Sequence, residues 1–237
     1  MAHGFHPTGL FLAGHAVFGA FPPADHDAYL DVVRPHFEPS PSPVVYVYVA
    51  SFDEVSPWPL SPYLEASVFV SVRHGAMEGW FPLMMPVTSK VAMFGGRRRG
   101  FPKESAEITL GETDRGWLGS ARRDGRLLLS VEVSAPSDVG DDFDDPRSHY
   151  YGAPIFNLVP PLRGPKVVAT TVESIGESSA SRSTGEMKTE ADPGLRWAPL
   201  LRPSATGWFE RSRGAKVLRH GRVAERFASR TSASGTK

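Results

Sequence analysis

The stretch Tyr63-Leu64-Glu65-Ala66-Ser67-Val68-Phe69-Val70-Ser71-Val72 changes character at every residue. One set of positions is purely aliphatic: Leu64, Ala66, Val68, Val70 and Val72. The other set mixes aromatic, hydroxyl and acidic side chains. Because successive side chains of a β-strand point to opposite faces, this alternation predicts a strand with one face in the core. The mixed face suits either the wall of a pocket or a partly exposed sheet surface.

Short apolar runs elsewhere in the chain predict further strands. They are separated by many of the 23 glycines and 22 prolines, which favour turns. We expect strands at Val44–Ala50, Trp117–Ala121, Arg126–Val133, Ile155–Val159, Lys166–Glu173, Ser183–Thr189 and Ala205–Glu210. Asp124-Gly125 lies between two of these runs and is a strong hairpin signal.

Two helices and a tail are also expected. A first helix can be capped by Asp25 or Asp27 and ends at Pro35. A last helix is expected over Val217–Phe227. Residues 228–237 are rich in Ser, Thr and Gly and are expected to be disordered, whereas residues 1–227 are expected to form a single domain.

The composition excludes several classes of function. The chain has 237 residues and a formal net charge of zero, which gives no reason to expect binding to nucleic acid or to an acidic membrane. No apolar run is long enough to span a membrane, so a cytoplasmic location is expected. The chain has no cysteine, and its 8 histidines lack metal-ligand spacing. We therefore expect no metal and no cofactor.

A basic segment carries the strongest chemical signal: Gly95-Gly96-Arg97-Arg98-Arg99-Gly100-Phe101-Pro102-Lys103-Glu104. It predicts a tight loop that ends in a rigid proline and a lysine. Nearby positive charges favour the neutral form of a lysine, and a neutral lysine can attack a carbonyl to form a Schiff base. The simpler interpretation is a solvated basic loop.

The order of the motifs resembles the acetoacetate decarboxylase family. The acidic strand comes first, followed by Met77-Glu78-Gly79-Trp80-Phe81-Pro82-Leu83-Met84-Met85-Pro86-Val87, then the Gly/Arg loop and Pro102-Lys103. The resemblance implies an α+β fold of mostly antiparallel strands, with the sheet curled into a barrel or cone and a few peripheral helices. It also implies a homo-oligomer that acts on a small oxo acid.

The resemblance assigns roles to particular residues. Lys103 matches the lysine that forms an imine with the substrate ketone, and Glu65 matches a glutamate in the same site. We expect these two to be catalytic. The expected substrate-binding residues are Arg97, Arg98, Arg99, Phe101, Trp80, Met84 and Met85, with the arginines near the substrate carboxylate.

The sequence also departs from the family pattern. Familiar members follow the lysine with a second lysine, where this chain has Glu104, and they carry a second acidic residue in a longer hairpin. Decarboxylation of a β-keto acid therefore competes with aldolase or dehydratase chemistry on a pyruvate-like acid. A non-catalytic protein that binds a small molecule in the same β-cone remains the alternative function.

Overall fold

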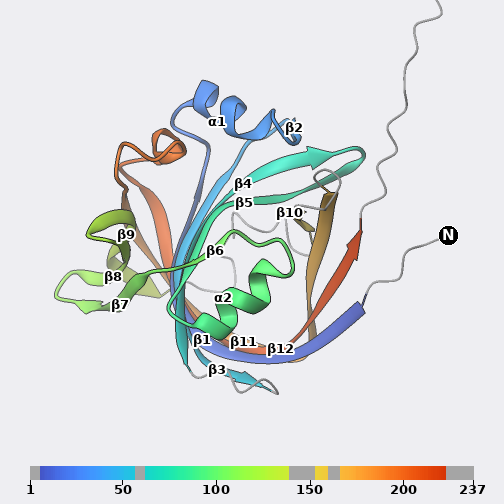
Figure 1. Cartoon of the computed structure of the whole chain (residues 1–237). Helices are drawn as coiled ribbons and strands as arrows, with labels where there is room; N and C mark the ends of the chain where they lie inside the picture. Colours follow the sequence, from blue (N-terminus) through green and yellow to red (C-terminus); the bar gives the residue numbers. More distant parts are fainter. Residues whose placement is uncertain (1–5, 57–61, 139–152, 160–165, 223–237) are drawn as a thin grey trace, which may run out of the picture.

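A computed structural model describes residues 6–56, 62–138, 153–159 and 166–222 of the chain (Figure 1). In chain order the elements are β1 (His6–Phe21), α1 (His26–Val33), β2 (Glu38–Pro39), β3 (Val45–Ser56), β4 (Tyr63–His74), β5 (Met77–Val87), α2 (Lys90–Arg97), β6 (Lys103–Ser105), β7 (Glu107–Thr113), β8 (Gly116–Arg123), β9 (Arg126–Asp138), β10 (Ile155–Val159), β11 (Lys166–Glu190), η2 (Ala198–Leu200) and β12 (Ala205–Arg222).

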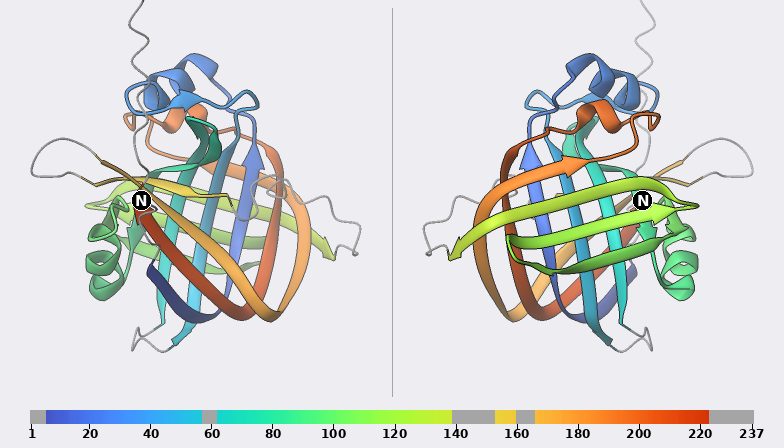
Figure 2. Two further views of the ribbon diagram at one scale, coloured as in Figure 1. Left: turned by 90° about the vertical axis from the view of Figure 1, so that its right-hand side faces the viewer. Right: turned by 90° about the vertical axis from the view of Figure 1, so that its left-hand side faces the viewer.

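The strands form one curled, mostly antiparallel sheet. Its order is β10-β5-β4-β3-β1-β12-β11-β9-β8-β7, with β2 beside β4 and β6 beside β5. Strand β10 pairs with both β5 and β11, so the strands from β10 through β4 and β1 to β11 close into a ring. The remaining strands β7, β8 and β9 cross the outside of this ring (Figure 2). The expected α+β fold with a curled antiparallel sheet is confirmed.

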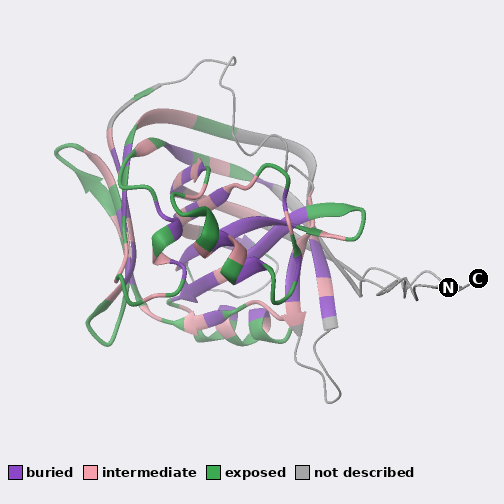
Figure 3. Cartoon of the chain, turned by 90° about the horizontal axis from the view of Figure 1, so that it is seen from above, coloured by how far each residue is buried: buried purple, intermediate pink, exposed green. Residues whose placement is uncertain are grey.

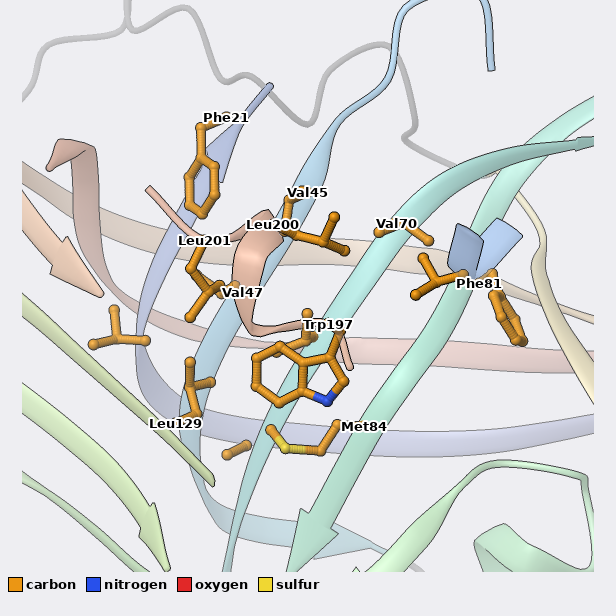
Figure 4. Close-up of a cluster of buried hydrophobic side chains, with 14 of the residues drawn as sticks. Phe21, Val45, Val47, Val70, Phe81, Met84, Leu129, Trp197, Leu200 and Leu201 are labelled. Carbon is orange, nitrogen blue, oxygen red and sulfur yellow. The ribbon is translucent and has the colours of Figure 1, made fainter. Parts of the chain in front are cut away.

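The outer face of the ring holds the main hydrophobic core. Aliphatic residues of β3 and β4 face this core and meet side chains from β5, β9 and the segment around η2 (Figure 4). Val47, Val68, Val70 and Leu129 are fully buried there. Seen from above, buried residues follow the central strands and exposed ones follow the hairpin turns (Figure 3). The aliphatic face predicted for 63–72 is therefore a core face.

Local signals account for several elements. Asp25 caps α1, as expected, by accepting a hydrogen bond from the Ala28 amide at 2.9 Å. Asp124 and Gly125 form the predicted hairpin turn with positive φ values of 52° and 78°. Strand β1 was not expected from the sequence. In the part of the chain that the structure describes, no helix is long and apolar enough to cross a membrane.

Three expectations about local structure are corrected. Residues 217–222 belong to β12, which pairs with β1 and β11, so a two-sided ladder replaces the expected helix; residues 223–227 lie outside the described residues. The runs expected as separate strands at 166–173 and 183–189 are one strand, β11, with a register shift between Ile175 and Ser179. Gly95, Gly96 and Arg97 form the last turn of helix α2 rather than a loop: Ser89 caps the start of this helix, and the Arg98 amide at its end donates to the Phe94 carbonyl.

Close packing of β8 on β3 gives a test of this arrangement. A Cβ atom at Gly119 would lie 2.5 Å from Cβ of Val49, whereas one at Gly111 would meet nothing within 4 Å. We expect Gly119→Ala to lower the free energy of unfolding by about 1–3 kcal/mol, because the added methyl group would overpack the core against Val49. Gly111→Ala is the control and is expected to stay within about 0.5 kcal/mol of the wild type. Equal urea midpoints for the two variants would contradict the packing of β8 on β3.

Candidate functional site

Strand β6 turns Lys103 toward the inside of the ring. β6 runs parallel to β5, and Lys103 is the direct partner of Met85. Directly paired residues share a face of a sheet, so the Lys103 side chain lies on the inner face while the next side chain, that of Glu104, points outward. The Lys103 backbone is held from behind by Arg97, whose Nε donates to the Lys103 carbonyl at 2.5 Å.

Helix α2 leaves a passage for the lysine side chain at Gly96. A Cβ atom there would lie 2.3 Å from Lys103 Cδ and 2.6 Å from Cε. No real Cβ contact is that short, so any larger residue must displace the lysine. The two glycines of the sequence motif therefore differ in the space around them, since a Cβ at Gly95 would meet only Arg99, at 3.6 Å.

Lys103 and Glu65 meet in a buried ion pair. The Lys103 Nζ donates to Glu65 Oε2, and their side chains are 10% and 4% exposed. The other carboxylate oxygen, Oε1, accepts a hydrogen bond from the Tyr48 hydroxyl at 2.5 Å. The ammonium also lies 6.0 Å from the centre of the Tyr63 ring. Glu65 is thus fixed from two sides, and one of its oxygens is reserved for the lysine.

The two tyrosines beside Glu65 are held in their neutral form. Burial raises the pKa of Tyr48 well above its ordinary value, and the negative charge and hydrogen bond of Glu65 raise it further, whereas a hydrogen bond with Ser67 acts in the opposite direction. Burial and the charge of Glu65 likewise raise the pKa of Tyr63. At neutral pH both groups are therefore phenols, and Tyr48 acts as a hydrogen-bond donor to Glu65.

An aromatic surface continues from this ion pair along the inner face. Tyr48 lies 6.0 Å from the rings of both Phe18 and Phe69, and Tyr46 lies 5.6 Å from Trp80. Trp80, Met85 and Phe101 pack in the same cluster as these tyrosines. Phe18, Tyr46 and Tyr48 are only half-buried, whereas their strand neighbours on the core side are buried. This accessible apolar wall beside a buried amine suits the binding of a small organic molecule.

Met84 and the loop arginines lie elsewhere. Met84 packs in the main core (Figure 4), because it is the direct partner of Val68 on the aliphatic face of β4, whereas the next residue, Met85, points to the inner face. Arg98 lies over the Phe94 ring, 5.0 Å from its centre, and Arg99 donates to the Gly95 carbonyl at 3.1 Å. With Arg97 on the Lys103 carbonyl, the described contacts of the three arginines are with α2 and β6 rather than with the amine.

Glu104, which stands where familiar family members have a second lysine, is directed away from Lys103. Glu104 forms an ion pair with Arg123 of β8. It lies on the opposite face of β6 from Lys103 and its charge has a cationic partner.

Two features of the inner face were not found from the sequence. Tyr48 had a signal, since Tyr46 and Tyr48 alternate with valines in the expected strand, but its pairing with Glu65 depends on the register of β3 against β4. Arg182 and Glu210, an ion pair at 2.7 Å, come from distant segments with no shared motif. Among the described residues, no three His, Asp or Glu side chains are grouped so that they could hold a metal ion.

This geometry can support nucleophilic chemistry. An amine, a carboxylate that can take its proton, and a phenol that orients the carboxylate lie in direct contact and largely out of water.

Comparison with known proteins agrees with the fold. The family profile described as acetoacetate decarboxylase (ADC) matches residues 8–209. An acetoacetate decarboxylase from Legionella pneumophila is similar in structure, with a TM-score of 0.74 and 18% identity over 94% of this chain and 90% of that one. The enduracididine biosynthesis enzyme MppR, complexed with the condensation product of pyruvate and imidazole 4-carboxaldehyde, is also similar in structure. Its TM-score is 0.66 and its sequence identity 16%, over 90% of this chain and 88% of that one.

An acetoacetate decarboxylase-like enzyme from Sphingomonas wittichii gives a TM-score of 0.62 and 18% identity, over 92% of each chain. No curated protein sequence matches at the significance threshold.

The raised pKa values predict how the 6 tyrosines titrate. In the unfolded chain each phenol ionises near its ordinary pKa of about 10, whereas Tyr48 and Tyr63 resist ionisation in the fold. The stability that these phenols contribute is therefore present below pH 10 and is lost as the pH rises above it.

Absorbance at 295 nm should follow this. Tyr48→Phe is expected to leave the signal of the folded protein unchanged up to about pH 11, and to remove one tyrosine from the signal of the protein in denaturant. A full tyrosine lost from the folded signal below that pH would show that Tyr48 is not held neutral.

Proposed function

The chain belongs to the acetoacetate decarboxylase family, and we propose that its Lys103 amine forms an imine with the ketone of a small oxo acid. The observation that carries this proposal is the buried contact between the Lys103 amine and Glu65. An exposed lysine would gain nothing from such a partner, and a structural ion pair would not need an accessible aromatic wall beside it.

Glu65 is the base in the first step. The amine must be neutral to attack, and Glu65 is in contact to accept its proton. A bond then forms between Nζ and the ketone carbon, and the former carbonyl oxygen takes up two protons and leaves as water. In balance, one ammonium and one ketone become one protonated imine and one water. Glu65 returns the proton that it accepted, and Tyr48 holds the carboxylate in place during both transfers.

The protonated imine then accepts an electron pair from the bond that breaks next. In a β-keto acid this is the bond to the carboxylate, which leaves as carbon dioxide. In a 2-oxo acid it is a C–H bond beside the imine, whose proton passes to the Glu65 carboxylate, and the resulting enamine can attack an aldehyde. The decarboxylases and the pyruvate condensation product of MppR among the similar structures are in keeping with both fates. Glu104 is paired with Arg123 on the face opposite Lys103, which is compatible with the first fate.

Reductive trapping tests the proposal. Borohydride with pyruvate or with acetoacetate should add the mass of the reduced ligand to the peptide that contains Lys103, and Lys103→Arg should remove this adduct. Absence of an adduct with pyruvate, with acetoacetate and with longer 2-oxo acids, in protein that is folded by circular dichroism, would contradict imine formation and favour a binding protein without catalysis.

The two glycines of α2 provide a matched pair for the same assay. Gly96→Ala places a methyl group on the path of the Lys103 side chain, so we expect the rate of trapping to fall at least tenfold while the fold is retained. Gly95→Ala has room for its methyl group and should stabilise the helix by up to about 1 kcal/mol without slowing the trapping. Equal trapping rates in the two variants would mean that the lysine does not act from this position.

A further inference from the structure

The sheet register places a second ion pair in line with the first. Glu65 is the direct partner of Ala50, Ala50 of Ala16, and Ala16 of Glu210, and Glu210 pairs with Arg182. Five neighbouring strands thus contribute one residue each to a single row. Since directly paired residues share a face, all five side chains lie on the inner face of the ring.

The two ends of this row are charged and its middle is small. Lys103 with Glu65 stands at one end, and Arg182 with Glu210 at the other. Between them lie the small side chains of Ala16 and Ala50, which are 3% and 6% exposed. The adjacent row runs from Tyr48 through Phe18 to Trp208, and Phe18 lies 5.7 Å from Trp208 in a stacked arrangement. The half-buried rings of Tyr48 and Phe18 therefore give a ligand that reaches toward both cations an apolar, aromatic wall.

The two cations differ in accessibility. The Arg182 side chain is 31% exposed, against 10% for its partner Glu210 and 10% for Lys103. An arginine held by one carboxylate still presents a planar, permanently charged group to a second one. The arginines expected to bind the substrate carboxylate, Arg97 to Arg99, contact α2 and β6 instead. Arg182 is thus a second cation on the inner face, in an ion pair separate from that of Lys103 and Glu65.

The spacing sets the size of the ligand. Three strand spacings separate Glu65 from Glu210, which puts their backbones about 14 Å apart along the sheet. The curl of the sheet and the length of the side chains shorten the gap between the charged ends. Even so, pyruvate and acetoacetate are too short to reach from the Lys103 amine to Arg182.

We propose that Arg182 binds a second, distal carboxylate of the substrate, so that the preferred ligand is an oxo acid with two acidic groups joined by an apolar chain of several carbons. The role of the ketone end rests on the proposed function, whereas the role of Arg182 in holding an anion does not. Glu210 is a positioning residue, because it fixes the guanidinium through Nε at 2.7 Å.

The test compares acids of equal length that differ only in the distal carboxylate. Reductive trapping at Lys103 is measured with 2-oxoadipate, 2-oxopimelate and 2-oxosuberate against 2-oxohexanoate, 2-oxoheptanoate and 2-oxooctanoate. Calorimetry with adipate, pimelate and suberate against hexanoate, heptanoate and octanoate measures binding without a ketone. For at least one length, the wild type should prefer the diacid at least tenfold in both assays.

The variant Arg182→Gln/Glu210→Gln removes the pair without leaving a buried carboxylate alone. In this variant the ratio by which the diacid is preferred over the monoacid should fall at least tenfold. Arg126→Gln is the control, since Arg126 pairs with Asp192 at 2.6 Å in an exposed bridge, and it should keep the preference. Should the double variant fail to fold, Arg182→Lys keeps the charge and loses the planar fork, so a partial loss of the preference is expected.

The outcomes separate the two proposals. A wild type without any diacid preference, or a double variant that retains it, overturns the role of Arg182 even if Lys103 is trapped. A preference for diacids in calorimetry that depends on Arg182, with no trapping at all, supports the anion site and contradicts the imine.

Discussion

The contact between Lys103 and Glu65 is the constraint on which the rest of the site depends. Moving an ammonium and a carboxylate out of water is costly, and removing one partner of such a buried pair typically costs about 3–5 kcal/mol. Three separate features must agree for the pair to form: the alternation of β4, the register of β6 against β5, and the absence of a side chain at Gly96. Together these features place the Lys103 amine beside the Glu65 carboxylate.

Closure of the sheet into a ring gives it an outer face that packs in the core and an inner face that carries the site. The outer face of β3 and β4 is aliphatic and packs under β8, β9 and the segment around η2, where it supplies the stability of the fold. The inner face is free of that task and carries the ion pairs and aromatic side chains. Tyr48 connects the Lys103–Glu65 ion pair with the aromatic surface, because its ring belongs to that surface and its hydroxyl donates a hydrogen bond to Glu65.

The sequence predicted what depends on local pattern. The alternation around Glu65 gave the strand and the face on which Glu65 lies, and Asp124-Gly125 gave the hairpin. It failed where long-range pairing overrides local preference: residues 217–222 resemble part of a helix but are hydrogen-bonded to strands on both sides. Arg182 was missed for the same reason, since its place beside Glu210 follows only from the register of β11 and β12.

Exchange of the ketone oxygen with solvent is the most direct measurement of the central claim, that Lys103 forms and releases an imine. Each round of imine formation and hydrolysis replaces that oxygen with one from water, with no reductant present. In water enriched in oxygen-18, we predict that the wild-type protein labels the ketone of a bound oxo acid well above the uncatalysed rate, and that Lys103→Arg does not. Equal labelling by the two proteins would show that the buried lysine is a structural ion-pair partner and not a nucleophile.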